Sequence, residues 1–324
     1  MSDILQGEGL VGLTEVEAAA RRLAGVAVRT PLLPADVISE IAGANVRLKC
    51  ESLQRAGSFK IRGAYNFVSQ LSDEQVASGI ITYSSGNHAQ AVALSGKLRG
   101  VRAVVVMPTT APKVKRDGAE RLGAEVIYEG TTSLERRAKA EEIAEEQGLV
   151  IVPPFDHRHI IAGQGTVGLE IAREWPDVDL VLAPIGGGGL ASGVAAAIKR
   201  LLPAARVIGV EPVGAASMRK ALDEERPVVI KKIDTIADGL APVIAGELTY
   251  EHAFSLMDDV VTVSDDAIRE ATSLLVSQQK LIVEFSGAAA TAALLSKAVE
   301  AEDARVAVVI SGGNLDPTLL AGMA

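Results

Sequence analysis

LVLAPIGGGGLASG, residues 180–193, contains the pattern that decides the fold. The apolar run from Leu180 to Pro184 has the length of a buried strand, and the small and apolar residues from Leu190 onward continue as a helix. Between them stand four glycines, Gly186, Gly187, Gly188 and Gly189, which expose backbone N–H groups with no Cβ in the way. A glycine turn from a strand into a helix is typical of α/β proteins. It also places these amides at the positive end of a helix, where phosphate is the expected ligand.

Short strand-like runs alternate with longer helix-like runs on both sides of this stretch, which predicts parallel sheets flanked by helices. The expected strands are residues 46–50, 80–83, 103–107, 125–128, 150–152, 180–184, 207–210 and 306–310. The expected helices include 131–147, with a capping box of Thr132 and Glu135 at its start and Gly148 at its end, and further helices near 163–174, from 190, and near 265–280 and 287–299. Pro153-Pro154 separates two such series and predicts a hinge between two α/β units.

The composition excludes several classes of protein. Of 324 residues, 32 are Lys or Arg and 41 are Asp or Glu, so the net charge of -9 disfavours binding to nucleic acid or to an anionic membrane. The N-terminus MSDILQGEGL lacks the features of a signal peptide, and no apolar run reaches the ~18 residues of a transmembrane helix. Cys50 is the only cysteine, which excludes an intramolecular disulfide and predicts a buried structural thiol. These features predict a cytoplasmic protein.

Two more polar loops directly follow predicted strands. Ser84-Ser85-Gly86-Asn87-His88 follows the strand 80–83, and Ser311-Gly312-Gly313-Asn314 follows the strand 306–310. Ligands of open α/β sheets bind beyond the carboxyl ends of the strands. These two loops and the four glycines therefore predict one common site.

A lysine stands at the start of another predicted helix. In GSFKIRGA, residues 57–64, Lys60 lies between Phe59 and Ile61. Such a lysine is usually a surface residue whose stem covers its apolar neighbours. The alternative is partial desolvation, which disfavours the ammonium form and frees an amine to condense with an aldehyde cofactor. The segment by itself leaves both interpretations open.

Other phosphate-binding motifs can be compared with the glycine stretch. Walker A requires Gly-Lys-Ser/Thr at its end, which Gly189-Leu190-Ala191 excludes. The dinucleotide fingerprint fits in its relaxed form, Gly186-x-Gly188-x-x-Ala191, with Glu211 at the end of the next strand. A nicotinamide-dependent oxidoreductase is therefore an alternative, although it leaves the other two polar loops unexplained.

Five motifs, in order along the chain, resemble those of the fold type II pyridoxal phosphate enzymes. They are SFKIRGA at 58–64, SSGNHAQ at 84–90, AGQGT at 162–166, the glycines at 186–189 and SGGN at 311–314. Among these enzymes the chain looks most like the threonine/serine dehydratases and the serine racemases. The resemblance implies an α/β fold of two domains, each an open, mostly parallel sheet flanked by helices, as in tryptophan synthase β-like folds. Residues 1–70 and 154–324 would form the large cofactor-binding domain, and 71–153 the small mobile domain.

The resemblance also implies a role for each matching residue. Lys60 would hold pyridoxal 5'-phosphate as an imine and remove the Cα proton of the substrate. The amides of Gly186, Gly187, Gly188, Gly189 and Leu190 would bind the phosphate. Phe59, Asn87, Phe155, Glu284 and Ser311 would surround the ring, with Asn87 at its phenolic oxygen and Ser311 at its pyridine nitrogen. Ser84, Ser85, Gly86, Asn87 and His88 would bind the substrate carboxylate, and Ser85 also matches an acid/base serine of the racemases.

The reaction implied by the resemblance is β-elimination of the hydroxyl of L-threonine or L-serine, which gives a 2-oxo acid and ammonia. Serine racemisation, or dehydration of another β-hydroxy amino acid such as 3-hydroxyaspartate or phenylserine, is an alternative. The family often binds a divalent cation, Mg²⁺ or Ca²⁺, at positions that Glu211, Ala215 and Ser217 occupy here. Ser217 replaces an aspartate of the family, and a neutral hydroxyl is a weaker ligand for a hard cation. A homodimer or homotetramer is also expected, without a C-terminal domain that binds an inhibitory amino acid.

Overall fold

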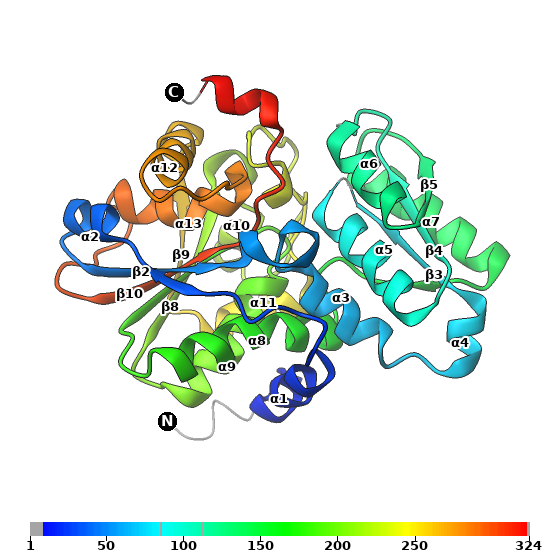
Figure 1. Cartoon of the computed structure of the whole chain (residues 1–324), viewed down its shortest axis with the longest axis horizontal. Helices are drawn as coiled ribbons and strands as arrows, with labels where there is room; N and C mark the ends of the chain where they lie inside the picture. The colour runs from blue at the N-terminus through cyan, green and yellow to red at the C-terminus, as the bar shows by residue number, and fades with distance from the viewer. Residues whose placement is uncertain (1–8, 85, 112, 323–324) are drawn as a thin grey trace.

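The computed structural model describes residues 9–84, 86–111 and 113–322, and in these residues the chain forms two β-sheets flanked by helices (Figure 1). One sheet has six strands in the order β1-β2-β10-β7-β8-β9, and the other has four in the order β5-β4-β3-β6. Each neighbouring pair is parallel except β1 and β2, which are antiparallel. The predicted fold class, two domains of open and mostly parallel sheet, is confirmed.

Both sheets draw their strands from widely separated parts of the sequence. The larger sheet contains β1 (Leu32–Pro34), β2 (Asn45–Cys50), β7 (Leu180–Pro184), β8 (Arg206–Pro212), β9 (Asp259–Val263) and β10 (Arg305–Ile310), and the smaller contains β3 (Ile80–Tyr83), β4 (Ala103–Met107), β5 (Glu125–Tyr128) and β6 (Val150–Ile151). The helices are α1 (Leu13–Arg22), α2 (Asp36–Ala42), α3 (Lys60–Val68), α4 (Asp73–Ser78), α5 (Asn87–Arg99), α6 (Lys113–Arg121), α7 (Ser133–Gln147), α8 (Arg158–Glu174), α9 (Gly189–Leu201), α10 (Ser217–Asp223), α11 (Glu247–Leu256), α12 (Asp265–Ser277) and α13 (Phe285–Leu295). Two short 3-10 helices, η2 (Glu51–Leu53) and η3 (Arg55–Gly57), join β2 to the segment before α3.

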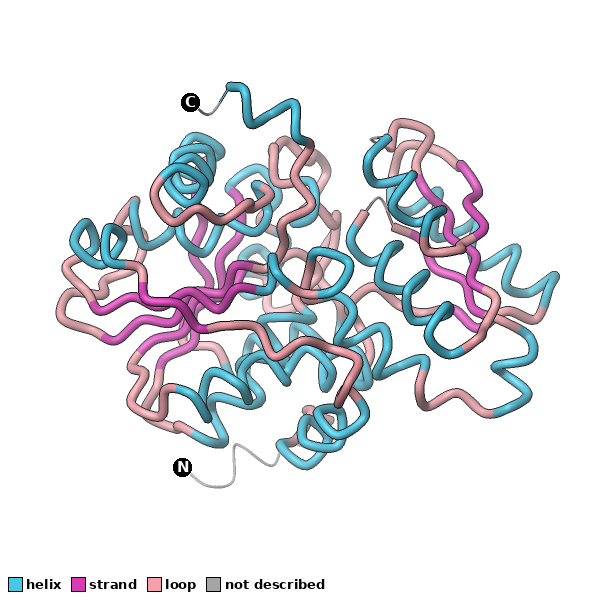
Figure 2. Tube along the Cα trace, in the orientation of Figure 1, coloured by secondary structure: helices cyan, strands magenta, loops and turns pink. Residues whose placement is uncertain are grey.

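Two apolar cores cover the two faces of the six-stranded sheet. α13 packs along one face with α2 and α12, while α8 and α9 cover the other face with α11 (Figure 1). Alternate residues of each central strand enter different cores, as the pleat of a strand requires. Leu182 and Val308 join the core under α13, whereas Val181 and Val309 join the core over α9. Figure 2 shows the strands of both sheets between their helical layers.

The four-stranded sheet has the same layered arrangement, and α3 connects it to the larger one. α5 and α6 lie on one face, where Ile61 and Ala64 of α3 complete the core, and α7 covers the other face. The backbone of α3 also lies against α8 of the larger domain, because a Cβ on Gly163 would come within 2.5 Å of the Arg62 carbonyl oxygen. The AGQGT motif therefore contains a glycine that lets α8 approach the helix beginning at Lys60.

The eight predicted strands all form, with ends that shift by no more than two residues. Thr132 and Glu135 form the predicted capping box of α7, and Gly148 ends that helix in the left-handed region with φ 68°. The helix expected from about residue 163 starts earlier, at Arg158, because the His157 side chain accepts a hydrogen bond from His159 N at 3.1 Å. β1, β9 and α11 were not predicted.

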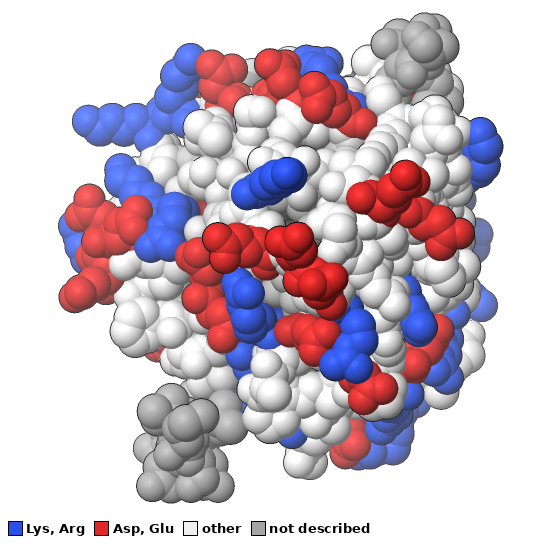
Figure 3. Space-filling view, turned by 90° about the vertical axis from the view of Figure 1, so that its left-hand side faces the viewer, with Lys and Arg blue, Asp and Glu red and all other residues white. Residues whose placement is uncertain are grey.

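Further sequence-based expectations can be compared with the structure. Cys50 is fully buried at the end of β2, and burial raises the pKa of its thiol to about 12, so the predicted buried thiol is confirmed. No helix among the described residues has both the length and the apolar character needed to cross a bilayer. On the face shown in Figure 3, acidic and basic side chains are interspersed instead of gathered by sign.

Candidate active site

Lys60 is the first residue of α3, and as a whole the residue is half-buried. Nζ donates a hydrogen bond to the carbonyl oxygen of Pro154 at 2.9 Å and lies 5.2 Å from the centre of the Phe59 ring. Burial lowers the pKa of Lys60 to about 8, and the nearby Glu284 carboxylate opposes this shift. The amine is therefore much easier to deprotonate than that of an exposed lysine.

Backbone pairing brings the segment before Lys60 against the loop after β10. Ser58 and Gly312 form an isolated antiparallel bridge, and Phe59 N donates to Ser311 O at 3.1 Å. Ser311 is 4% exposed. Two motifs more than 240 residues apart thus lie side by side, because β2 and β10, which precede them, are neighbouring parallel strands.

A chain of side chains links the loop after β10 to the start of α5. Asn87, the first residue of α5, donates to Glu284 Oε1 through Nδ2, and its Oδ1 accepts from Asn314 Nδ2 at 2.8 Å. Glu284 directly precedes α13 and is 3% exposed. A Cβ on Gly312 would come within 2.1 Å of Glu284 Oε1, so the carboxylate requires glycine beneath it. The structure therefore brings Asn87, Glu284 and the Ser311 loop together.

The four glycines after β7 form a loop that leads into α9. Gly188 adopts φ +96°, a conformation that favours glycine, and α9 begins at Gly189 without a side-chain cap. A Cβ on Gly187 would come within 2.2 Å of the Phe155 ring, so this ring packs directly on the loop. The first amides of a helix have no intrahelical acceptor. The loop therefore offers N–H groups, including those near Leu190, to an anionic ligand.

The predicted substrate loop lies between β3 and α5. Gly86 N donates to Ser84 Oγ at 3.2 Å, while Ser85 lies outside the described residues. His88 Nε2 lies 3.1 Å from the carbonyl oxygen of Val152, and burial, with a smaller contribution from Lys60, lowers the pKa of His88 to about 3. The His88 ring is therefore neutral at physiological pH, and it faces the backbone of Val152.

Glu211, Ala215 and Ser217, the predicted cation ligands, lie at the end of β8 and the start of α10. Both Glu211 oxygens accept backbone hydrogen bonds, from Met218 N and Arg219 N at 2.8 Å each. Burial raises the pKa of this carboxyl to about 7 despite these bonds. No group of three or more His, Cys, Asp or Glu side chains in the described part of the chain is arranged to hold a metal ion. The cation site stays a prediction.

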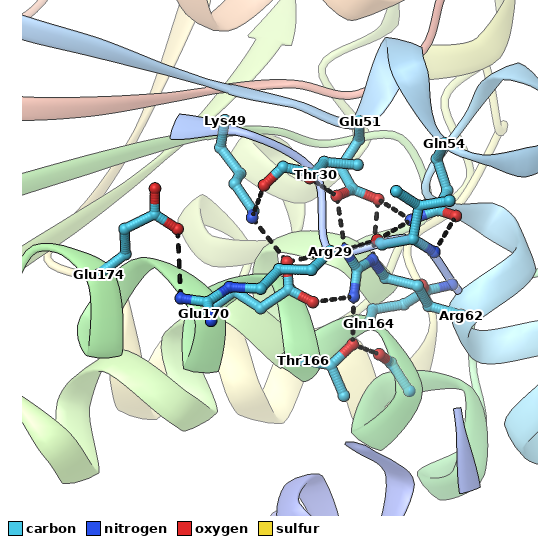
Figure 4. Close-up of polar contacts among 12 residues, drawn as sticks. Arg29, Thr30, Lys49, Glu51, Gln54, Arg62, Gln164, Thr166, Glu170 and Glu174 are labelled. Carbon is cyan, nitrogen blue, oxygen red and sulfur yellow. Dashed lines mark hydrogen bonds and ion pairs between the residues drawn. The ribbon is translucent and has the colours of Figure 1, made fainter. Parts of the chain in front are cut away.

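A buried network of charges surrounds Arg62 (Figure 4). Arg62, two residues along α3, has a side chain that is 1% exposed. Its Nε and Nη2 each donate to a Glu51 oxygen at 2.8 Å, and its Nη1 and Nη2 donate to Glu170 at 2.7 and 3.0 Å. Lys49 Nζ donates to Glu170 Oε2 at 2.6 Å, so two cations face two carboxylates. The network ties the start of α3 to η2 and α8.

Two residues that contact the site, Pro154 and Asn314, were given no role at the site in the prediction from sequence. The Pro154 carbonyl accepts the hydrogen bond of Lys60, and a backbone carbonyl has no sequence signature. Asn314 contacts Asn87 and also donates to Ala56 O at 2.9 Å. Asn314 is the last residue of the SGGN motif, which directly follows a strand. This position in the sequence could have indicated that Asn314 contributes to the site.

These features define an α/β protein that combines a lysine of lowered pKa with a glycine loop at a helix N-terminus. Comparison with known proteins identifies the family to which it belongs. The chain belongs to the pyridoxal-phosphate dependent enzymes, whose family model matches residues 23–312. The predicted family, and with it pyridoxal phosphate as cofactor, is confirmed. The nicotinamide alternative is not retained.

Several individual members of this family are similar to the chain over most of their length. The chain is 43% identical to the L-threonine ammonia-lyase of Thermotoga maritima, over 96% of this chain and 77% of that protein. The structure of maize serine racemase superposes with a TM-score of 0.93 and 38% identity, covering 96% of each chain. The processed form of threonine deaminase isoform 2 from Solanum lycopersicum gives a TM-score of 0.91 and 40% identity, covering 96% of this chain and 86% of that one.

Proposed function

We propose that this enzyme is an ammonia-lyase that converts L-threonine or L-serine to a 2-oxo acid and ammonia by β-elimination. The observation that carries the proposal is the place of Lys60. Its amine, with a pKa of about 8, contacts Pro154, and the next residue, Phe155, packs on the glycine loop. The similarity to an L-threonine ammonia-lyase over most of both chains supports the same reaction.

The residues present fit pyridoxal phosphate. The loop 186–189 offers helix N-terminal amides with no side chain in the way, and an added Cβ on Gly187 or Gly188 would collide with Phe155 or Thr249, respectively. Lys60 supplies the amine that can hold the cofactor aldehyde covalently. When bound, pyridoxal phosphate supplies an electron-withdrawing ring that stabilises negative charge developing at Cα of the substrate.

Lys60 acts first as the covalent anchor and then as the base that takes the Cα proton. Both tasks require a neutral amine, and a pKa of about 8 makes this form far more available near neutral pH than an ordinary lysine would. The Pro154 carbonyl holds Nζ in place. Loss of the Cα proton and of the β-hydroxyl as water leaves an enamine, which water hydrolyses to the 2-oxo acid and ammonia.

Other residues orient the reactants and tune the ring. Asn87 is fixed by Glu284 and Asn314, which positions its amide for the phenolic oxygen. Ser311 provides a neutral hydroxyl for the pyridine nitrogen, which limits electron withdrawal and favours elimination over transamination. The amides at the start of α5, including that of His88, suit the substrate carboxylate because they lie at a helix N-terminus.

The proposal extends to the division of the chain into domains. All four strands of the smaller sheet fall within residues 71–153, the predicted small domain. Pro153 and Pro154 lead from its last strand back to the large domain, and the Pro154 carbonyl contacts Lys60. Movement of residues 71–153 about this segment would open and close the site while Lys60 stays on α3.

The reaction is tested with a panel of β-hydroxy amino acids. L-threonine and L-serine should release ammonia and a 2-oxo acid in equal amounts, measured by coupled assays for each product. Chiral chromatography of the remaining amino acid measures inversion at Cα. The similarity to maize serine racemase makes this second measurement necessary. Conversion between D- and L-serine without ammonia release would overturn the proposal in favour of a racemase.

The pH dependence of cofactor attachment tests the state of Lys60. In cofactor-free enzyme, the rate of covalent attachment should rise with pH and level off above about pH 8, because Lys60 reacts only as the neutral amine. Below that pH the ammonium form predominates and attachment slows. Stopped-flow absorbance measures the rate, and the α-amino-blocked amino acid lysine serves as the control for an exposed amine. A midpoint near the ordinary lysine pKa of 10.5 would contradict the desolvated position.

A further inference from the structure

Thr249 contacts the glycine loop on the side of α11. It lies in the first turn of α11 and is completely buried. Its Oγ1 donates to the carbonyl oxygen of Gly187 at 2.7 Å, and the Gly246 carbonyl lies at 3.1 Å. A hydroxyl has a single proton to donate, so the shorter contact, to Gly187, is the stronger of the two.

This hydrogen bond fixes the direction of an amide in the loop. In a trans peptide unit the carbonyl and the following N–H point in opposite directions. Anchoring Gly187 O on α11 therefore turns Gly188 N–H away from α11. Gly188 has φ +96°, and a Cβ on it would come within 2.7 Å of Thr249 Cβ, so the loop and the threonine are in close contact. Without an anchor, a glycine peptide has unusual freedom to rotate.

Asp156, two residues after Pro154, in turn holds the start of α11. Its Oδ2 accepts from Glu247 N at 3.0 Å, and its Oδ1 accepts from Thr249 N at 3.1 Å. Gly246, the residue before the helix, has no side chain with which to cap it. A Cβ on Gly246 would come within 2.2 Å of Asp156 Cγ, so glycine permits the approach of the carboxylate.

We propose that Thr249, held by Asp156, is a positioning residue that orients the Gly188 amide toward the phosphate group of pyridoxal phosphate. The inference rests on the proposed role of the glycine loop as the phosphate cradle. Thr249 then contributes to affinity for the phosphate end of the cofactor and leaves the interaction with its aldehyde end unchanged. A purely structural threonine would not discriminate between these two ends.

The test compares two ligands that differ only in the phosphate. Cofactor-free full-length enzyme is titrated with pyridoxal phosphate and with pyridoxal, and binding is followed by absorbance. Thr249→Val removes the hydroxyl at nearly constant shape. It should weaken binding of pyridoxal phosphate about tenfold, as the loss of one hydrogen bond predicts, and leave binding of pyridoxal unchanged. Thr249→Ser, which keeps the hydroxyl, should restore the affinity.

Thr272→Val is the matched control. Thr272 is also completely buried in a helix, and its Oγ1 donates to Ile268 O at the same 2.7 Å, but it lies on α12. This variant should bind both ligands as the wild type does. Asp156→Asn is a second test, because an amide nitrogen facing Glu247 N or Thr249 N replaces an acceptor by a donor. It should weaken pyridoxal phosphate selectively, as Thr249→Val does.

The outcomes separate this inference from the proposed function. Equal weakening of both ligands by Thr249→Val, or no weakening of either, would overturn the role of Thr249 while leaving the cradle intact. If Thr249→Val does not fold, the same comparison for Asp156→Asn decides the matter. Wild-type enzyme that binds pyridoxal as tightly as pyridoxal phosphate would refute the phosphate cradle itself, and the inference with it.

Discussion

Lys60→Ala is expected to lower ammonia release from L-threonine or L-serine by at least about 10³-fold, because it removes both the covalent anchor and the base that takes the Cα proton. Lys60 Nζ contacts the Pro154 carbonyl, and the neighbouring Phe59 N donates to Ser311 O, so alanine at position 60 removes the amine that these contacts hold in the site. Steady-state kinetics measures the loss. Intact mass after borohydride reduction gives an independent measurement, since the wild type should gain the mass of the reduced cofactor and the variant should not.

Lys97→Ala is the control for this experiment. Lys97 is an exposed lysine in the last turn of α5, and it takes no part in the contacts described for Lys60. Its replacement should leave both the activity and the gain of mass unchanged. Normal turnover by Lys60→Ala, or retention of the covalent adduct in that variant, would refute the assignment of Lys60.

The positions of two of the site loops could be predicted from the sequence because local rules decide them. The loops 186–189 and 311–314 directly follow β7 and β10 of the six-stranded sheet, and parallel strands present their carboxyl ends at one edge. The loop 84–88 follows β3 of the other sheet, so this rule does not place it. β10 pairs with both β2 and β7, so the loops after these strands meet. The register of the pairs then places Ser58 opposite Gly312, which no local pattern shows.

The buried charges around Arg62 could not be predicted for the opposite reason. Lys49 alternates with apolar residues in β2 and looks like a residue on the solvent side of a strand, yet its side chain is completely buried. Its burial depends on Glu170, which is 121 residues away and arrives only when α8 packs on the sheet. A charged residue can be buried when a partner neutralises it, and the partner is set by tertiary structure.

Elements at the edge of the larger sheet were missed because their patterns are weak. β9 contains only the short run Val260-Val261-Thr262-Val263 after Asp259, and one residue on each of its faces, Val260 on one and Val263 on the other, is buried. The residues before α11 show no clear hydrophobic periodicity, so the sequence could not place Thr249 near the glycine loop. Its contact with Gly187 depends on the packing of α11 against α9.

Arg62→Met is expected to lower the free energy of unfolding by about 3–5 kcal/mol, because it leaves buried carboxylate without its cation. Lys49 still faces Glu170 at 2.6 Å in this variant, so Glu51 is the carboxylate that loses its direct partner. Urea unfolding at about pH 7.5 measures the loss. Arg102→Met is the control, because Arg102 pairs with Glu125 at an exposed position and its removal should cost about 1 kcal/mol or less.

Arg62→Met should lose less stability, relative to the wild type, at low pH than at neutral pH. The protonation of Glu51 determines the direction of this change. Burial works to raise the pKa of Glu51, but in the wild type Arg62 outweighs it and holds that pKa below 4.5. The wild type therefore gains stability from Glu51 above its unfolded pKa and loses it as the pH falls through the folded pKa. With Arg62 absent, burial prevails and the folded state binds the proton more readily than the unfolded chain does. Acid then favours the folded variant, so the stability difference between wild type and Arg62→Met should shrink from about pH 7.5 to pH 5. A difference that stays constant over this range would show that the lost packing of the Arg62 side chain, and not the uncompensated Glu51 charge, is what destabilises the start of α3.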